Sequence, residues 1–296
     1  MTVKTSTLKI FSVALILFLL AGCVDQKAKS EKRIDGDHAR IITTSAACAD
    51  IMDKLDVDLV AIAESQLQPP PERYKNLPTI GMAMSPDMEK ISSMNPDYVF
   101  SPASLMPDLL PKYRAAGIPF GFVNLSNVPG MYRSIEDMGR LLNREKEAEV
   151  LVKDYEDFMK DFQARNKGPA PRVLILMGLP GSYVVATDKS YVGSLVKLAG
   201  GENVYPDEDQ QFLTVNTEDM LEKDPDIILR TAHAMPDKVH QMFQDEFKNN
   251  DVWKHFRAVK EDKVFDLNTK LFGMSANFSY KEALGDLEKV FYGQGN

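Results

Sequence analysis

Few residues in this sequence are suited to catalysis. It holds two cysteines and four histidines in 296 residues, and no G-x-S-x-G, H-E-x-x-H or Walker sequence occurs. The segment GLPGS, which begins at Gly178, lacks the lysine of a Walker loop. A hard divalent-metal cage of several imidazoles and carboxylates is also difficult to assemble from so few histidines. We therefore expect no enzymatic activity.

The net charge of the chain also limits its possible partners. The formal net charge is −8, and an acidic balance of this size argues against nucleic acid or anionic lipid as the main partner. Loss of Lys4 and Lys9 with the N-terminal segment described next would make the charge more negative by two.

The first 22 residues are expected to be a targeting segment. Lys4 and Lys9 precede an apolar run, which ends in the tetrapeptide LAGC at Cys23. This tetrapeptide resembles a bacterial lipoprotein processing box, in which cleavage leaves a lipid-modified cysteine at the N-terminus. The run is too short and wrongly flanked for a membrane-spanning helix. We expect a protein attached through Cys23 to the extracytoplasmic face of the cell membrane.

The mature chain is long enough for two domains. Residues 23–37 are polar and lysine-rich, which predicts a flexible tether. With Cys23 bound to lipid, Cys48 is the one remaining thiol, so no intramolecular disulfide is expected. Small neighbouring residues indicate that Cys48 is a core residue rather than a ligand.

The segment EDMLEKDPDIILRTAHAM, from Glu218 to Met235, has the most informative pattern. A short amphipathic helix is expected to end at Asp224, because the residue before a proline disfavours the α conformation. The apolar run Ile227–Leu229 is typical of a strand buried on both faces of a parallel sheet. Open α/β sheets bind ligands beyond the carboxyl ends of their strands. His233 is therefore the first candidate ligand residue.

The same pattern occurs earlier in the chain. EKISSMNPDYVF, which begins at Glu89, matches the segment from Glu218 at an offset of 129 residues. Similarity at so long a period predicts two similar domains rather than a solenoid. A two-lobed protein with a cleft between the lobes is the expected architecture.

The remaining pattern fits an α/β fold class with two Rossmann-like, parallel-rich lobes, joined by a long interlobe helix and binding ligand in the cleft. We predict a first lobe over residues 38–130, an interlobe helix over 131–168 and a second lobe over 169–296. Strands are expected at residues 40–43, 57–63, 117–123, 172–177, 183–186 and 264–267, and helices at residues 45–55, 131–165, 191–199 and 280–292, with a further helix starting at 85–87.

One methionine is a candidate partner for His233. Met84 precedes the expected helix start at Ser85, and the fourth position of that helix is Glu89, so Met84 has no hydrophobic staple to make. The other histidines have a weaker position, since His38 lies in the tether while His240 and His255 lie on polar helix faces. Histidine and methionine together are axial ligands of heme iron.

A helix start in the first lobe could hold carboxylates. Thr43, Thr44, Ser45 and Ala46 connect the first expected strand to a helix, whose N-terminus presents free backbone N–H groups. The propionates of heme would suit this position. The alternative is that Thr44 and Ser45 only cap the helix.

Several segments carry a family resemblance. These are the 19-residue segment from Val173 to Tyr191, GGENV from Gly200, DPDIILR from Asp224 and NNDVWKHF from Asn249. With the bilobal repeat and the processing box, they resemble the helix-hinged substrate-binding proteins of ABC importers. Within that class they look very like the heme-binding lipoproteins of the iron-regulated surface determinant (Isd) system. The resemblance covers nearly the whole mature chain and is strongest in the second lobe.

The resemblance implies a set of functional residues. In that family a methionine and a histidine hold the iron, at positions that match Met84 and His233. Met82 is a possible substitute for Met84, because the segment from Ile80 reads IGMAM. Glu89 and Glu218 match the acidic residues that dock the permease, although first-turn acids also stabilise helix N-termini.

The partners implied are heme, an ABC permease, the membrane through Cys23 and upstream cell-surface heme-binding proteins. Two alternatives remain open. A siderophore or corrinoid binder on the same scaffold would contact its ligand through residues such as Arg230 and Tyr183. An exported hydrolase would need Ser45 or Ser182 to act as nucleophile with His233 as base.

Overall fold

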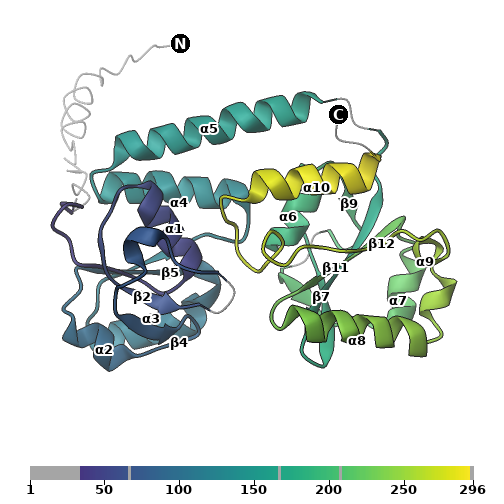
Figure 1. The fold of residues 1–296 in the computed structure, drawn as a ribbon, viewed down its shortest axis with the longest axis horizontal. Helices are drawn as coiled ribbons and strands as arrows, with labels where there is room; N and C mark the ends of the chain where they lie inside the picture. The colour runs from purple at the N-terminus through teal and green to yellow at the C-terminus, as the bar shows by residue number, and fades with distance from the viewer. Residues whose placement is uncertain (1–33, 66–67, 166–167, 207–208, 294–296) are drawn as a thin grey trace, which may run out of the picture. The chain divides into compact units, whose positions relative to one another are not determined.

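The computed structural model describes residues 34–65, 68–165, 168–206 and 209–293 (Figure 1). The predicted targeting segment, Cys23 and most of the tether lie outside these residues. The α/β class with two parallel-rich sheets is confirmed. Among the described helices, none has both the length and the apolar composition needed to cross a bilayer.

The first sheet has the strand order β4-β3-β2-β1-β5-β6. Its strands are parallel except for β4, which pairs antiparallel with β3. The elements, with η marking 3-10 helices, are β1 (Ile41–Thr43), α1 (Ala46–Lys54), β2 (Leu59–Glu64), η1 (Glu72–Tyr74), β3 (Thr79–Met82), β4 (Ser85–Pro86), α2 (Met88–Ser93), β5 (Tyr98–Pro102), η2 (Ala103–Leu105), α3 (Met106–Ala116) and β6 (Phe120–Val123).

The second sheet has the order β10-β8-β7-β11-β12, and β9 pairs with β7. Strands β7, β11 and β12 are parallel, whereas β8 is antiparallel to both β7 and β10. The elements are β7 (Arg172–Leu179), β8 (Ser182–Ala186), α6 (Tyr191–Leu198), β9 (Glu202–Asn203), β10 (Phe212–Leu213), α7 (Thr217–Glu222), β11 (Ile227–Ala232), α8 (Pro236–Asn249), η3 (Trp253–His255), α9 (Arg257–Lys260), β12 (Val264–Asp266) and α10 (Tyr280–Tyr292).

The repeat seen in the sequence is a repeat of structure. Helices α2 and α7 have the same length, and the N-cap residues Asp87 and Asn216 each accept a hydrogen bond from the backbone three residues later. Both helices are followed by a turn with a left-handed residue, Asn95 at φ 45° and Asp224 at φ 44°. Asn and Asp tolerate this conformation better than other non-glycine residues. Strands β5 and β11 then begin at equivalent positions.

An arginine fixes each repeat to the strand beside it. The Arg40 N–H donates to Asp97 Oδ2 at 2.8 Å, and its guanidinium donates to the Met94 carbonyl. In the second repeat the Arg172 N–H donates to Asp226 Oδ2 at 2.8 Å. The Arg172 guanidinium donates to the carbonyl of Lys223, the equivalent of Met94. These bonds set where β5 starts beside β1 and where β11 starts beside β7.

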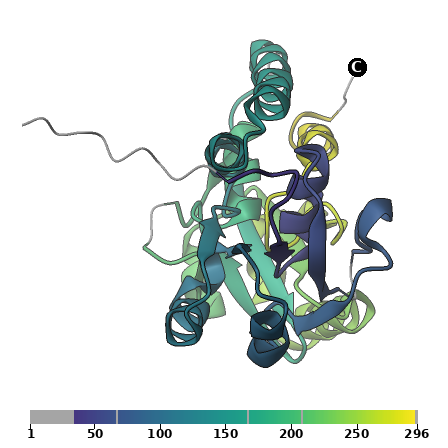
Figure 2. The same ribbon diagram turned by 90° about the vertical axis from the view of Figure 1, so that its left-hand side faces the viewer.

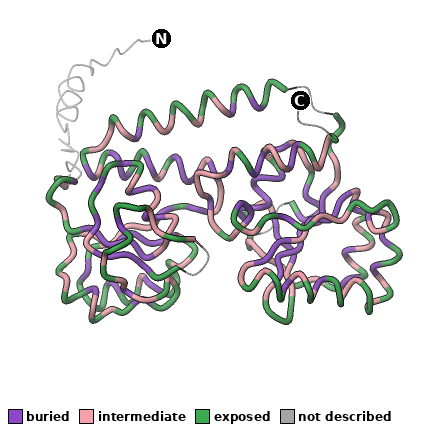
Figure 3. Tube along the Cα trace, viewed as in Figure 1, coloured by how far each residue is buried: buried purple, intermediate pink, exposed green. Residues whose placement is uncertain are grey.

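Helices cover both faces of each sheet. In the first sheet α1 lies on one face, and α2 and α3 lie on the other (Figure 2). Ile41 packs toward α1 while Ile42 packs toward α2 and α3, as period-2 alternation requires. In the second sheet a separate cluster on the side of α7, α8 and α9 is built around Trp253, which stacks on Phe247 with ring centroids 4.1 Å apart. Buried residues follow the strands, and the outer side of α5 is exposed (Figure 3).

The prediction of one interlobe helix over residues 131–168 is wrong. The segment forms two helices, α4 (Val128–Leu141) and α5 (Glu145–Ala164). Asn143 lies between them with φ 57°, a left-handed residue that ends the first helix. Tyr155 of α5 stacks on Tyr132 of α4 with ring centroids 4.3 Å apart, and both rings contact Tyr280 of α10.

The predicted tether also ends earlier than expected. Residues 34–37 belong to the folded part, since the Ile34 N–H donates to the Leu141 carbonyl at 2.8 Å. Asp37 pairs with Arg144, a residue of the α4–α5 connection. Polar composition alone therefore overestimated the length of the tether by these four positions.

Removal of the Asp226 carboxylate should destabilise the fold. Asp226→Ala would leave the Arg172 N–H without its acceptor, at a cost of about 1–3 kcal/mol at neutral pH. Burial alone would raise the pKa of Asp226, but hydrogen bonds from Arg172 and Arg257 outweigh it and lower the pKa. The stabilisation is therefore present above the ordinary pKa of about 4 and is lost as pH falls below it, so the difference between variant and wild type should shrink.

Urea denaturation at neutral and acidic pH measures both effects. Glu222→Ala, which removes an exposed carboxylate from α7, is the matched control and should change stability by less than about 0.5 kcal/mol. Equal stability of Asp226→Ala and wild type at neutral pH would contradict the proposed role of this bond.

Candidate ligand-binding site

His233 is the first residue beyond β11. The strand runs three residues further than the predicted Ile227–Leu229, so Arg230, Thr231 and Ala232 still belong to the sheet. The His233 N–H donates to the Gly178 carbonyl at 2.9 Å, which continues the β7–β11 pairing by one bond. His233 therefore lies at the carboxyl end of β11, a strand with a parallel neighbour on each side, as predicted.

Gly178 allows helix α8 to pack closely beside this position. A Cβ at Gly178 would lie 2.2 Å from Cγ1 of Val239 and 2.8 Å from Cε2 of Phe243, both on α8. No real side chain tolerates such distances, so a larger residue would displace the helix. Sequence reasoning noted Gly178 as part of an incomplete Walker-like segment and missed this packing role. A glycine directly after an apolar strand was the available signal.

The environment of His233 favours a neutral ring. The side chain is partly buried, and desolvation lowers its pKa below the ordinary value of 6.5. No hydrogen bond joins its imidazole to another residue in the described part of the chain. A neutral imidazole has a free lone pair, which is the form that binds a metal.

Met84 lies in a β-hairpin rather than before a helix. Ser85 and Pro86 form β4, and helix α2 begins at Met88 with Asp87 as its N-cap, so the predicted helix start at Ser85 is wrong. The hairpin turn consists of Ala83 and Met84. The argument from a missing hydrophobic staple therefore does not apply, but the side chain is 66% exposed. The Met82 side chain, at the end of β3, is 57% exposed, so both thioethers are accessible.

Fewer of the residues at the helix start after β1 are accessible than predicted. Thr43 and Thr44 are fully buried. The Thr44 hydroxyl donates to Ser101 Oγ of β5 at 2.9 Å and so is directed into the fold rather than toward solvent. Ser45 is the N-cap of α1, where its hydroxyl accepts from the Cys48 N–H. No acidic residue occupies the first turn of α1, so the positive end of the helix dipole is not offset there.

The hairpin and this helix start share one edge of the first sheet. Strands β1, β2 and β3 are parallel, so the residues that follow β1 and β3 leave the sheet on the same side. Met82, Met84, Ser45 and Ala46 are thus placed at the carboxyl edge of the first sheet, and His233 at the carboxyl edge of the second.

Arg230 and Tyr183, the residues expected to contact a siderophore or corrinoid, already bind other side chains of the protein. Arg230 forms a bidentate ion pair with Asp266 at 2.8 and 2.6 Å, and its guanidinium lies over the Phe247 ring. The Tyr183 hydroxyl donates to Glu246 Oε1 at 3.1 Å. Engaging a ligand would require breaking these contacts.

The arrangement required for a hydrolase does not form among the described residues. Ser45 is engaged as a helix cap, and Ser182 begins β8 next to the β7–β8 turn. Neither hydroxyl has a hydrogen bond to His233, and a nucleophile needs its base within such reach.

The remaining histidines and the thiol occupy structural positions. His38 and His255 are exposed, and His240 is partly buried on α8. Cys48 is buried, and desolvation raises its pKa to about 12, so it is a neutral core thiol as predicted. Across residues 34–293, apart from the undescribed gaps, no group of three or more His, Cys, Asp or Glu side chains could hold a metal ion.

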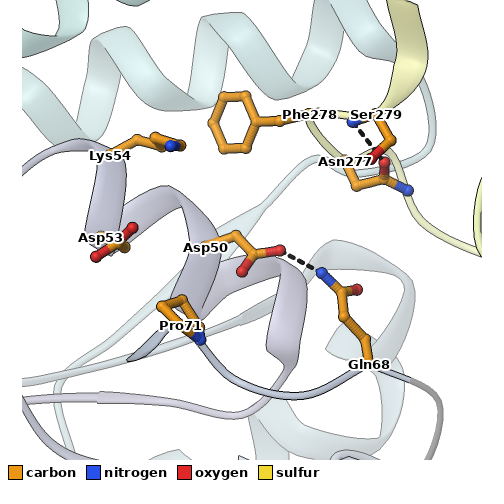
Figure 4. Close-up of a pocket in the computed structure, with 8 residues that line it drawn as sticks. All are labelled: Asp50, Asp53, Lys54, Gln68, Pro71, Asn277, Phe278 and Ser279. Carbon is orange, nitrogen blue, oxygen red and sulfur yellow. Dashed lines mark hydrogen bonds between the residues drawn. The ribbon is translucent and has the colours of Figure 1, made fainter. Parts of the chain in front are cut away.

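A polar pocket of about 240 Å³ lies beside helix α1 (Figure 4). Burial raises the pKa of Asp50 to about 6, although Gln68 donates a hydrogen bond to its carboxylate. The pocket contains none of the predicted site residues. Its lining is Asp50, Asp53, Lys54, Gln68, Pro71, Asn277, Phe278 and Ser279.

The two predicted docking acids have equivalent positions. Glu89 and Glu218 are exposed residues in the first turns of α2 and α7, the repeated helices. Their placement suits a helix-dipole role and leaves both carboxylates accessible.

Comparison with known proteins gives consistent matches. The chain is 40% identical over 293 residues to the high-affinity heme uptake system protein IsdE of Staphylococcus aureus strain Newman, and the match covers 98% of both chains. The crystal structure of S. aureus IsdE complexed with heme superposes with a TM-score of 0.81 at 41% identity, over 86% of this chain and 99% of that chain.

A second solved structure is equally similar. An ABC transporter substrate-binding protein from Listeria monocytogenes EGD-e superposes with a TM-score of 0.80 at 42% identity, over 86% of this chain and 99% of that chain. The sequence profile described as "Periplasmic binding protein" matches residues 41–271, which include both sheets. The chain is therefore a member of the periplasmic binding protein family.

Proposed function

We propose that this protein is a lipid-anchored receptor that binds one heme and delivers it to an ABC permease. The observation that carries the proposal is a partly buried, neutral imidazole, His233, at the carboxyl end of β11 in a chain with exposed thioethers at the carboxyl end of β3. The 40% identity to a heme uptake protein supports the same ligand. In this proposal heme is cargo and no catalysis occurs.

The axial ligands proposed are His233 and Met84. Neutral imidazole and thioether are both suited to heme iron, and neither ligand brings a negative charge to the metal. Met82 lies two residues away on the same hairpin and is the alternative sulfur ligand. The exposure of both side chains supports their availability and does not distinguish between them.

The propionates of heme are proposed to lie at the N-terminus of α1. Ser45 and Ala46 are its partly exposed residues, and backbone N–H groups in this first turn have no intrahelical acceptor. Thr43 and Thr44, which are buried, would contribute by holding the end of β1 in place.

Each segment of the chain has a part in this proposed role. We propose a signal peptide over residues 1–22, lipidation at Cys23, a tether that ends before Ile34, a first lobe from 34 to 127, an interlobe segment formed by α4 and α5, and a second lobe from 169 to 296, with heme between the lobes. The anchor would hold the receptor at the extracytoplasmic face of the membrane, near the permease and upstream heme-binding proteins.

Substitution of each proposed axial ligand should change the absorbance spectrum of bound heme. Heme added to the wild type should give a low-spin absorbance spectrum. His233→Ala should lose it and weaken binding by at least about 10–100-fold, because an iron ligand is removed. Met84→Ala should lose the thioether ligand, whereas Met82→Ala should retain it. His255→Ala, an exposed histidine, is the matched control. An unchanged spectrum of His233→Ala would remove this residue from the site.

The pKa of His233 should lie below 6.5 in the heme-free protein, because burial disfavours the charged ring. An NMR titration measures it, with His233→Gln to assign the resonance. Since the folded-state pKa is lowered, the unfolded state takes up the proton first. The wild type should therefore lose more stability than His233→Gln as pH falls through 6.5. A measured pKa at or above 6.5 would contradict the neutral-imidazole argument.

Glu89 and Glu218 are proposed to dock the permease. Charge reversal of both to lysine should greatly reduce heme transfer into proteoliposomes that contain the permease, while leaving the heme spectrum unchanged. Glu282→Lys, an exposed first-turn acid on α10, is the matched control. Transfer at the wild-type rate by the double variant would reject the docking role.

A further inference from the structure

Met235 has an unusual backbone conformation. Six non-glycine residues of the described chain have positive φ, and five of them are aspartate or asparagine, which tolerate the left-handed region. The sixth is Met235, at φ 47° and ψ 59°. A bulky residue in this region is strained, and such strain persists only where the surrounding structure imposes it.

The fold itself makes little use of a methionine here. Met235 is the N-cap of α8, but its side chain makes no capping hydrogen bond. Asparagine or glycine would suit both the conformation and the cap better. The side chain is 53% exposed, so it is not a core residue.

Its position connects Met235 to the candidate site. It lies two residues beyond His233, between the carboxyl end of β11 and helix α8, which starts at Pro236. The backbone conformation therefore fixes where this thioether leaves the chain relative to the imidazole.

Exposed apolar side chains are concentrated at such positions. Among the described residues, the large exposed hydrophobic side chains are Val150 and five methionines. The methionines lie at or beyond the carboxyl ends of strands in both sheets. Met82 ends β3 and Met84 follows it, Met106 starts α3 after β5 and η2, Met235 lies between β11 and α8, and Met274 lies between β12 and α10. Methionine is flexible and polarizable, which suits contact with a flat apolar surface.

We propose that Met235 is a ligand-contacting residue, which packs its thioether against the apolar face of the macrocycle beside His233. This inference rests on the proposed heme-binding function and adds a contact from the second lobe besides the iron ligand. The strained conformation is retained because the contact stabilises the complex, not the free protein.

Substitution of Met235 by asparagine separates the effect of backbone strain on stability from the effect of the side-chain contact on heme binding. Met235→Asn keeps a residue that tolerates the left-handed conformation but removes the apolar contact. The heme-free variant should melt at or above the wild-type temperature, because strain is relieved. Heme should dissociate from it at least about tenfold faster, as expected for loss of a buried apolar group. The low-spin spectrum should persist, since His233 is intact.

Two further variants complete the experiment. Met235→Leu preserves an apolar side chain and should release heme within about threefold of the wild-type rate. Val150→Asn, which replaces the exposed apolar residue of α5, should change neither quantity.

Three outcomes would overturn the inference. Wild-type heme dissociation from Met235→Asn would show that no contact exists. A lowered melting temperature of the heme-free Met235→Asn variant would show that the residue serves the fold. Loss of the low-spin spectrum in Met235→Leu would assign the sulfur to the iron instead. Failure of the wild type to bind heme at all would reject the proposed function, and is a different result from each of these.

Discussion

The pairing of parallel strands at the centre of each sheet determines where His233 and the start of α1 lie. Strand β5 runs beside β1 and β11 runs beside β7, and in both cases an aspartate at the start of the strand accepts the N–H of the neighbouring arginine. Parallel strands that start together also end on the same side. The residues beyond their carboxyl ends, including His233, are therefore placed by bonds made at the opposite edge of the sheet.

Polar side chains around β11 stabilise one another, and none of the described residues forms a hydrogen bond with the His233 imidazole. Arg230 is held by Asp266, and the Thr231 hydroxyl donates to the Phe272 carbonyl at 2.8 Å. These contacts fix the last residues of the strand. His233 follows the strand directly, and desolvation lowers the pKa of its imidazole. The proposed role of His233 as a ligand needs such a fixed strand end directly before the imidazole.

The sequence predicted the architecture well because its repeat is carried by residues with strong local preferences. The Pro-Asp pairs and the apolar runs behind them correctly indicated the starts of β5 and β11. The position of His233 after its strand followed from the same pattern. The sequence did not decide which methionine is the better candidate sulfur ligand, because Met82 and Met84 occur in one short hairpin and their exposed fractions do not separate them.

Two local errors have physical causes. Ser85-Pro86-Asp87 has the composition of a helix start, yet Ser85 and Pro86 pair with β3, and Asp87 caps the helix instead. Pairing with a neighbouring strand outweighed a local preference. The break between α4 and α5 falls at Asn143, where neither proline nor glycine gives a signal. Asparagine tolerates the left-handed conformation and can end a helix, so Asn143 was the available signal. The stack of Tyr155 on Tyr132 then holds the two helices together.

The close approach of α8 to β7 at Gly178 has a consequence for how this protein can vary. The glycine itself is buried and offers no side chain to any ligand, but Val239 and Phe243 occupy the space that a Cβ would need. Even alanine would push the helix outward together with the short connection that carries His233. Natural variation should therefore be as restricted at Gly178 as at His233, the proposed iron ligand. A survey of inactive variants should find substitutions at the packing of α8 on β7 as well as at the proposed ligands.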